Sequence, residues 1–82
     1  MIYSEENLGK ILCGMYDNAP HKEQKTMIFL FGIKYGRIIE ENGFNIATIV
    51  EKSGINKTYQ TEVRNGVKLG RYVAIKPDMD TF

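Results

Sequence analysis

The chain has 82 residues, of which 43% are apolar and 26% are charged, and its formal net charge is +1. This length provides for one domain with a single modest hydrophobic core, and the composition is that of a globular protein. The single cysteine, Cys13, excludes an internal disulfide, and no segment resembles a signal peptide. We therefore expect a protein of the reducing cytoplasm.

The first predicted element is an amphipathic helix over residues 4–16. Ser4 suits the N-cap position, and Glu5 and Glu6 suit the positive end of the helix dipole. One face of this helix carries the apolar side chains of Leu8, Ile11, Leu12 and Met15. A turn then leads to Pro20, a residue that favours the first position of a new helix.

The second predicted helix, over residues 21–42, is the longest and the most apolar. One side carries Met27, Ile28, Phe31, Tyr35, Ile38 and Ile39, and another side carries Phe29, Leu30 and Ile33. Two apolar sides indicate either a central helix packed between the other helices or a helix that contacts a second copy of the protein. The segment does not span a membrane, since its apolar run is short and Lys34 and Arg37 interrupt it.

Residues 45–66 have the pattern of two short helices joined by a tight turn. The first helix carries Ile46, Ile49 and Val50 on one face, and Gly54 follows as its C-terminal stop. Ile55 fills the corner, and Asn56 caps a second helix over residues 56–66. Tyr59 and Val63 then form the inner face of that second helix, which Asn65 and Gly66 end. This succession predicts a helix-turn-helix.

The segment 45–66 resembles the phage-repressor type of helix-turn-helix, in its apolar first helix, its Gly54-Ile55-Asn56 turn and its Asn65-Gly66 ending. Gln60 departs from that family, which buries an aliphatic residue there. Most of the chain is also similar to a small bacterial family described only as HTH-like, a family that implies this fold and no established activity. The shared residues are Leu30 to Tyr35, Gly54, Ile55, Thr58, Tyr59, Glu62, Gly66, Leu69, Tyr72 and Val73.

The C-terminal part predicts one short strand and a tail. Residues 71–76 alternate, with Val73 and Ile75 on one face, which indicates a β-strand. The sequence does not identify the strand that would pair with it: this could be the N-terminal residues or a strand of another subunit, or the segment could be extended without a partner. We therefore expect an all-α domain of four helices with a short C-terminal strand over residues 1–77, followed by a flexible tail over residues 78–82.

Charge is concentrated in the second half of the chain. The span from Lys52 to Lys76 carries six basic side chains and one acidic side chain. With Tyr59 and Val63 facing inward, an outward stripe follows from the helical repeat, and it consists of Lys57, Thr61, Arg64 and Lys68. The phage-repressor resemblance implies that the residues facing the DNA groove are Asn56, Lys57, Thr58, Thr61, Glu62 and Asn65.

Enzymatic function is not indicated. The only histidine, His21, has no cysteine or acidic cluster beside it at metal-ligand spacing, and the chain has no Gly-rich phosphate loop. The sequence therefore predicts no catalytic residue, no metal, no cofactor and no small-molecule ligand.

Two functions fit these patterns. The first is a DNA-binding transcriptional regulator that places helix 56–66 in the major groove of double-stranded DNA, most naturally as a homodimer on paired half-sites. The second is a protein-interaction module on the same scaffold, which docks a partner through Phe29, Leu30 and Ile33 of the long helix.

Overall fold

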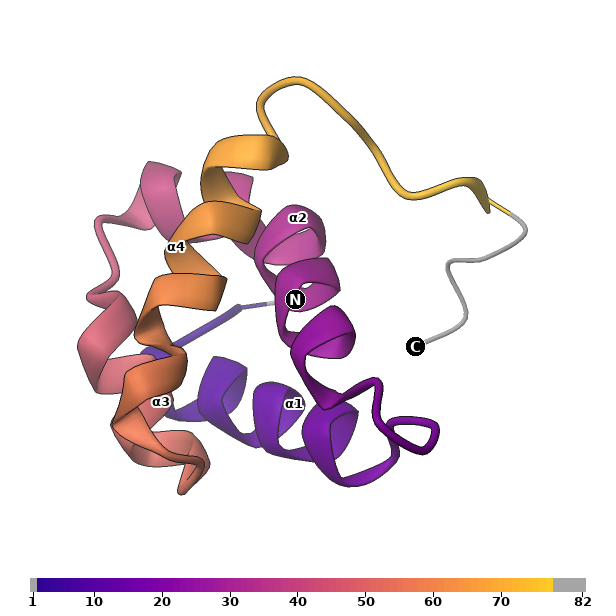
Figure 1. Ribbon diagram of the computed structural model, residues 1–82. Helices are drawn as coiled ribbons and strands as arrows, with labels where there is room; N and C mark the ends of the chain where they lie inside the picture. Colours follow the sequence, from indigo (N-terminus) through magenta and orange to yellow (C-terminus); the bar gives the residue numbers. More distant parts are fainter. Residues whose placement is uncertain (1, 78–82) are drawn as a thin grey trace.

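The computed structural model describes residues 2–77 and confirms the prediction of an all-α domain with four helices. Figure 1 shows them packed around one core. The helices are α1 (Glu5–Asp17), α2 (Gln24–Asn42), α3 (Ile46–Ser53) and α4 (Gln60–Leu69), and a 3-10 turn, η1 (Lys57–Tyr59), directly precedes α4. No helix described over residues 2–77 combines the length and apolar content needed to cross a bilayer.

The N-termini of α1 and α3 are capped by side chains. Ser4 accepts a hydrogen bond from the backbone N–H of Asn7 at 3.0 Å, as its position predicted. Asn45 caps α3 in the same way, by accepting from the N–H of Thr48 at 3.1 Å. Glu5 of α1 also accepts from the N–H of Asn45 at 2.6 Å, across 40 residues of sequence. The first turn of α1 is thereby tied to the start of α3.

The predicted start of α2 at residue 21 was wrong, because the helix begins three residues later. Pro20 lies in a turn, where its carbonyl oxygen accepts from the N–H of Glu23 at 2.9 Å. Lys22 has a φ of 65°, which is incompatible with a right-handed helix. The predicted helix over residues 56–66 was likewise displaced. Its first turn is the 3-10 turn η1, and α4 continues through Gly66 as far as Leu69.

The core lies between all four helices. Its fully buried side chains come from α1, α2, α3 and α4 and are Leu8, Leu12, Ile28, Phe31, Ile49, Val50 and Val63. Helix α2 packs against α1 on one side and against α4 on another, so most of its apolar surface is covered within the chain. Of the two alternatives that the sequence left open for this helix, this arrangement corresponds to a central helix packed between the other helices.

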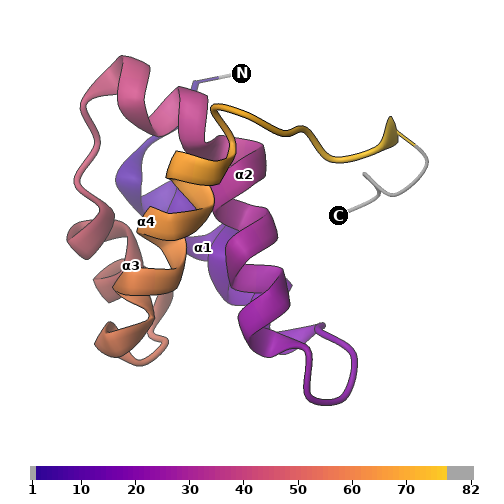
Figure 2. The same ribbon diagram turned by 45° about the horizontal axis from the view of Figure 1, so that its top comes forward.

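Helices α2 and α4 run side by side in the same direction, as Figures 1 and 2 both show. Their backbones touch through glycines. A Cβ atom placed on Gly32 would lie 2.6 Å from the carbonyl oxygen of Val63, and one on Gly66 would overlap the carbonyl oxygen of Phe29. Gly70 similarly faces Ile33. Any larger residue at Gly32 or Gly66 would therefore push the two helices apart.

The predicted strand over residues 71–76 was wrong, since residues 2–77 contain no strand. The N–H groups of Tyr72 and Val73 donate instead to the carbonyl oxygen of Leu69, at 2.9 and 3.1 Å, and so close the end of α4. Beyond them the chain lies outside the helix bundle (Figure 1), where Val73 and Ile75 line a shallow hollow with Ile33 of α2. No second extended segment pairs with residues 73–76 in the described part of the chain, and a strand needs one. The tail predicted over residues 78–82 lies outside the described residues.

Candidate nucleic-acid interface

The turn between α3 and α4 is fixed by local polar contacts. The hydroxyl of the buried Ser53 donates to the carbonyl oxygen of Val50 at 2.5 Å and accepts from the N–H of Ile55 at 3.2 Å. Gly54 ends α3 with a φ of 79°, which favours glycine. Asn56 then accepts from the N–H of Thr58 at 2.9 Å and so caps η1. These contacts set the direction in which α4 leaves the turn.

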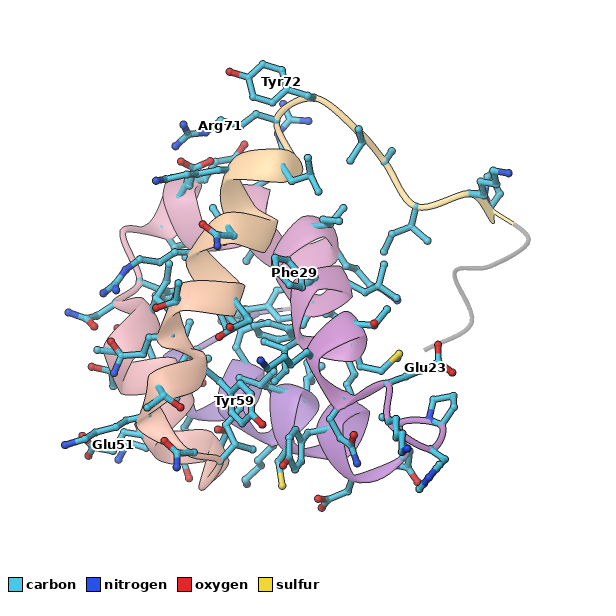
Figure 3. All side chains as sticks on the ribbon, in the orientation of Figure 1. Glu23, Phe29, Glu51, Tyr59, Arg71 and Tyr72 are labelled. Atoms are coloured by element: carbon cyan, nitrogen blue, oxygen red, sulfur yellow. The ribbon has the colours of Figure 1, made fainter. Side chains whose placement is uncertain are left out.

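Aromatic packing holds the beginning of α4 against α1. The rings of Tyr59 and Tyr16 have centroids 5.7 Å apart. A hydrogen bond between the two hydroxyl groups raises the pKa of Tyr16 above its ordinary value. In Figure 3, Tyr59 points from the start of α4 toward α1. The inner face of α4 continues with Val63, Gly66 and Val67, all buried.

Most of the predicted DNA-contacting residues share the exposed outer side of η1 and α4. Because α4 passes through Gly66, the stripe defined above extends to its fourth member, Lys68. The exposed residues of the predicted set are Asn56, Lys57, Thr58, Thr61, Arg64, Asn65 and Lys68. None of these seven side chains contributes to the buried core.

Glu62 is placed differently from the other predicted contacts. Its side chain is half-buried, and one carboxylate oxygen has no contact with solvent and no hydrogen-bond partner among the described residues. Glu62 lies at i+3 from Tyr59 and at i−4 from Gly66, which is inner-face spacing on a helix. The spacing therefore carried a signal that this residue would turn inward.

The charges of the stripe are available to a ligand. Among the described residues, no acidic side chain lies within ion-pair distance of Lys57, Arg64 or Lys68. Arg64 makes one long hydrogen bond, from Nη2 to Oε1 of Gln60 at 3.5 Å. Gln60 is half-buried and lines a shallow hollow with Lys57 and Glu51.

One basic residue next to α4 was missed by the sequence reasoning. Arg71 follows the helix directly and forms an ion pair with Glu40 of α2 through its Nη2 and Nε groups. The hydrogen bond from Arg71 lowers the pKa of Glu40 below its ordinary value. The pair joins positions 31 residues apart, so no local pattern predicted it. Extending the stripe by one more step along the helical repeat, however, would have reached Arg71.

The three residues predicted as a partner or dimer interface do not form one exposed surface. Leu30 is half-buried and packs against the core. Phe29 and Ile33 are also half-buried, but they do not pack against the core cluster. Ile33 lines a shallow hollow together with Val73 and Ile75. Figure 3 shows Phe29 on α2, and its carbonyl oxygen faces Gly66 of α4.

Comparison with known proteins identifies a family for this chain but finds no relative whose activity is described. No curated protein and no solved structure matches the chain. A family model described as an HTH-like domain matches residues 4–76, which include α1 to α4 and the turn between α3 and α4. The chain belongs to this HTH-like domain family.

Proposed function

We propose that the protein binds double-stranded DNA through the exposed side of η1 and α4, and that it acts as a small transcriptional regulator. The observation that carries this proposal is the stripe of Lys57, Thr61, Arg64 and Lys68, fully outside the core, on the second helix of a helix-turn-helix. In known proteins with this motif the second helix lies in the major groove.

The side chains of the stripe suit the two kinds of contact that DNA offers. The guanidinium of Arg64 can hydrogen-bond to both O6 and N7 of a guanine, and the hydroxyl of Thr61 can contact a base edge or a phosphate. Lys57 and Lys68, near the two ends of the stripe, supply positive charge for phosphates. Glu62, which is half-buried, has no groove contact in this proposal.

The strength of binding expected from one copy is modest. Lys57 and Lys68, if each neutralises one phosphate, give a slope of log K against log salt of about −1.8. Specific regulators usually need more contacts than this, and two copies on paired half-sites would double them. We therefore include a homodimer on DNA in the proposal.

The test is binding of the purified protein to random-sequence duplex DNA, measured by fluorescence anisotropy from low to physiological salt. Arg64→Glu and Lys57→Glu should abolish binding. Lys10→Glu is the matched control, since Lys10 is an exposed lysine on α1 and its reversal changes the net charge equally. Circular dichroism checks that all variants are folded. No binding of the wild type at low salt, or equal losses in all three variants, contradicts the proposal.

The second candidate function is a protein-interaction module, and the observation that favours it is that the half-buried Phe29 and Ile33 of α2 do not pack against the core cluster. Under this alternative, Arg64→Glu leaves complex formation unchanged, while Phe29→Lys or Ile33→Glu disrupts it. With the purified protein alone, the partner that can be tested is a second copy of the chain. Sedimentation equilibrium of the wild type and of Ile33→Glu gives the answer: an unchanged monomer in both removes a second copy as the partner.

A further inference from the structure

Arg71 continues the basic stripe beyond the end of α4. Gly70 keeps helical backbone angles, with φ −61° and ψ −14°, and the N–H of Arg71 donates to the carbonyl oxygen of Lys68 at 3.2 Å. The helical path therefore reaches Arg71. At 100° per residue, Thr61, Arg64, Lys68 and Arg71 fall within a sector of about 80° around the helix axis. The backbone position of Arg71 thus lies at the edge of the stripe, while its guanidinium reaches sideways to Glu40 of α2.

The position of Arg71 along the helix suits a contact with the DNA backbone. Fourteen residues separate it from Lys57, which corresponds to about 21 Å at a rise of 1.5 Å per residue. The major groove is about 12 Å wide. When the middle of the stripe contacts base edges, its two ends therefore lie near the phosphates that border the groove. Figure 3 places Arg71 at the end of α4 opposite to Tyr59.

Glu40 holds the guanidinium of Arg71 in place without covering it. The carboxylate accepts from Nη2 and, at 3.4 Å, from Nε of Arg71, so it occupies one edge of the guanidinium. The Arg71 side chain is still 55% exposed. A guanidinium has five N–H donors in a rigid plane, so the groups of Nη1 remain for a second anion. A lysine could not present two such edges.

We propose that Arg71 is a further phosphate-binding residue of the DNA interface and that Glu40 is its positioning residue. This inference rests on the proposed DNA binding, and it adds one phosphate contact, made by Arg71, and one residue, Glu40, that orders this contact before DNA binds. Because Glu40 orders the Arg71 side chain before DNA arrives, less rotamer freedom is lost on binding. The carboxylate and the phosphate occupy different edges of the guanidinium, so they do not compete.

The chain offers a matched control for Arg71. Arg37 on α2 is also exposed and also forms an ion pair with a glutamate, Glu41, at 3.0 Å. Its removal changes the net charge and breaks one surface ion pair, as removal of Arg71 does. Arg37 is on α2, outside the stripe, and lines the same hollow as Glu40 and Arg71. Its removal therefore shows whether any positive charge near this hollow contributes to binding, or Arg71 in particular.

The experiment compares Arg71→Ala, Arg71→Lys, Glu40→Gln and Arg37→Ala with the wild type, by anisotropy on duplex DNA over a series of salt concentrations. Arg71→Ala should weaken binding about tenfold at low salt and reduce the magnitude of the salt slope by about 0.9. Arg37→Ala should leave the slope unchanged. Arg71→Lys should keep the slope and lose affinity, because the charge remains but the planar donors are lost.

The variant Glu40→Gln distinguishes two roles of the Glu40 carboxylate: it either positions Arg71 for DNA or competes with the DNA phosphate for Arg71. It removes a negative charge near the DNA, which alone would tighten binding. A positioning role predicts the opposite, namely weaker binding than wild type with an unchanged salt slope. Tighter binding by Glu40→Gln would mean that the carboxylate competes with phosphate, and it would overturn the positioning role.

The outcomes distinguish this inference from the proposed function. If wild type binds DNA and Arg64→Glu abolishes binding, but Arg71→Ala behaves like Arg37→Ala, Arg71 is no phosphate contact and the DNA-binding function stands. If wild type binds no DNA, the proposed function fails and the inference falls with it. Circular dichroism of each variant confirms that the helices are intact, since both ion pairs are on the surface.

Discussion

Replacing Gly66 with alanine tests the closest contact in the fold. Gly66 lies in the interior of α4, where alanine alone would stabilise the helix by about 1 kcal/mol. The added Cβ, however, would overlap the carbonyl oxygen of Phe29 and lie 3.0 Å from the Cα of Gly32. Both are backbone atoms, which cannot rotate away as the end of a side chain can.

The steric effect should exceed the gain in helix propensity. Overpacking of a well-packed interior typically costs about 1–3 kcal/mol, and rigid backbone neighbours place Gly66 at the upper end of this range. We therefore expect Gly66→Ala to lower the free energy of unfolding by about 2 kcal/mol. In a domain of this size that corresponds to a fall in Tm of roughly 8–16 °C.

Gly14→Ala is the matched control. Gly14 also lies inside a helix, α1, but no heavy atom outside its own helix and neighbours lies within 4 Å of its added Cβ. Its replacement should stabilise the protein by about 1 kcal/mol. Urea and thermal unfolding followed by circular dichroism measure both variants. If Gly66→Ala is as stable as Gly14→Ala, the backbone contact between α2 and α4 is not present as described.

Three further predictions concern single interactions in the fold. Asn45→Ala removes the N-cap of α3 and should lower the free energy of unfolding by about 1 kcal/mol in urea titrations, and Asn45→Asp should restore most of it. Ile49→Val removes one methylene from a fully buried side chain and should also lower it by about 1 kcal/mol, whereas no change would mean that the core is loosely packed at this point. Arg71 lowers the pKa of Glu40 in the folded state, so this pair stabilises the protein above the ordinary glutamate pKa and loses that contribution as the pH falls through the lowered value. The stability difference between wild type and Glu40→Gln should therefore vanish in acid, and a difference independent of pH would contradict this linkage.

The sequence predicted the helix-turn-helix well because its signals are local. Asn56 bonds to the backbone N–H of Thr58, two residues away, and Gly54 takes the positive φ that ends α3. Such contacts depend only on neighbouring residues, so the residue types reveal them. The exposed stripe followed from the same local periodicity.

The errors arose where residues distant in sequence decide the structure. Val73 and Ile75 have the propensity and alternation of a strand, but propensity cannot supply a pairing partner. The start of α2 is an exception, because its error is local: Pro20 is compatible with both a helix start and a turn, and the left-handed backbone of Lys22 makes it a turn. The pairing of Arg71 with Glu40 depends on how α2 and α4 align, which the glycine contacts determine.

The separation between the stripe and the core has a consequence for how this scaffold can change. None of the side chains of Lys57, Thr61, Arg64 and Lys68 contributes to the buried core, and the close approach of α4 to α2 is made by glycines on the opposite side of the helix. Apart from glycine and proline, which disfavour a helix, substitutions at these four positions should therefore cost little in folding free energy. A library randomised at the four sites should yield mostly folded proteins, each with its own surface chemistry on the same frame. The surface chemistry of the stripe and the packing of the fold therefore depend on different residues of this chain.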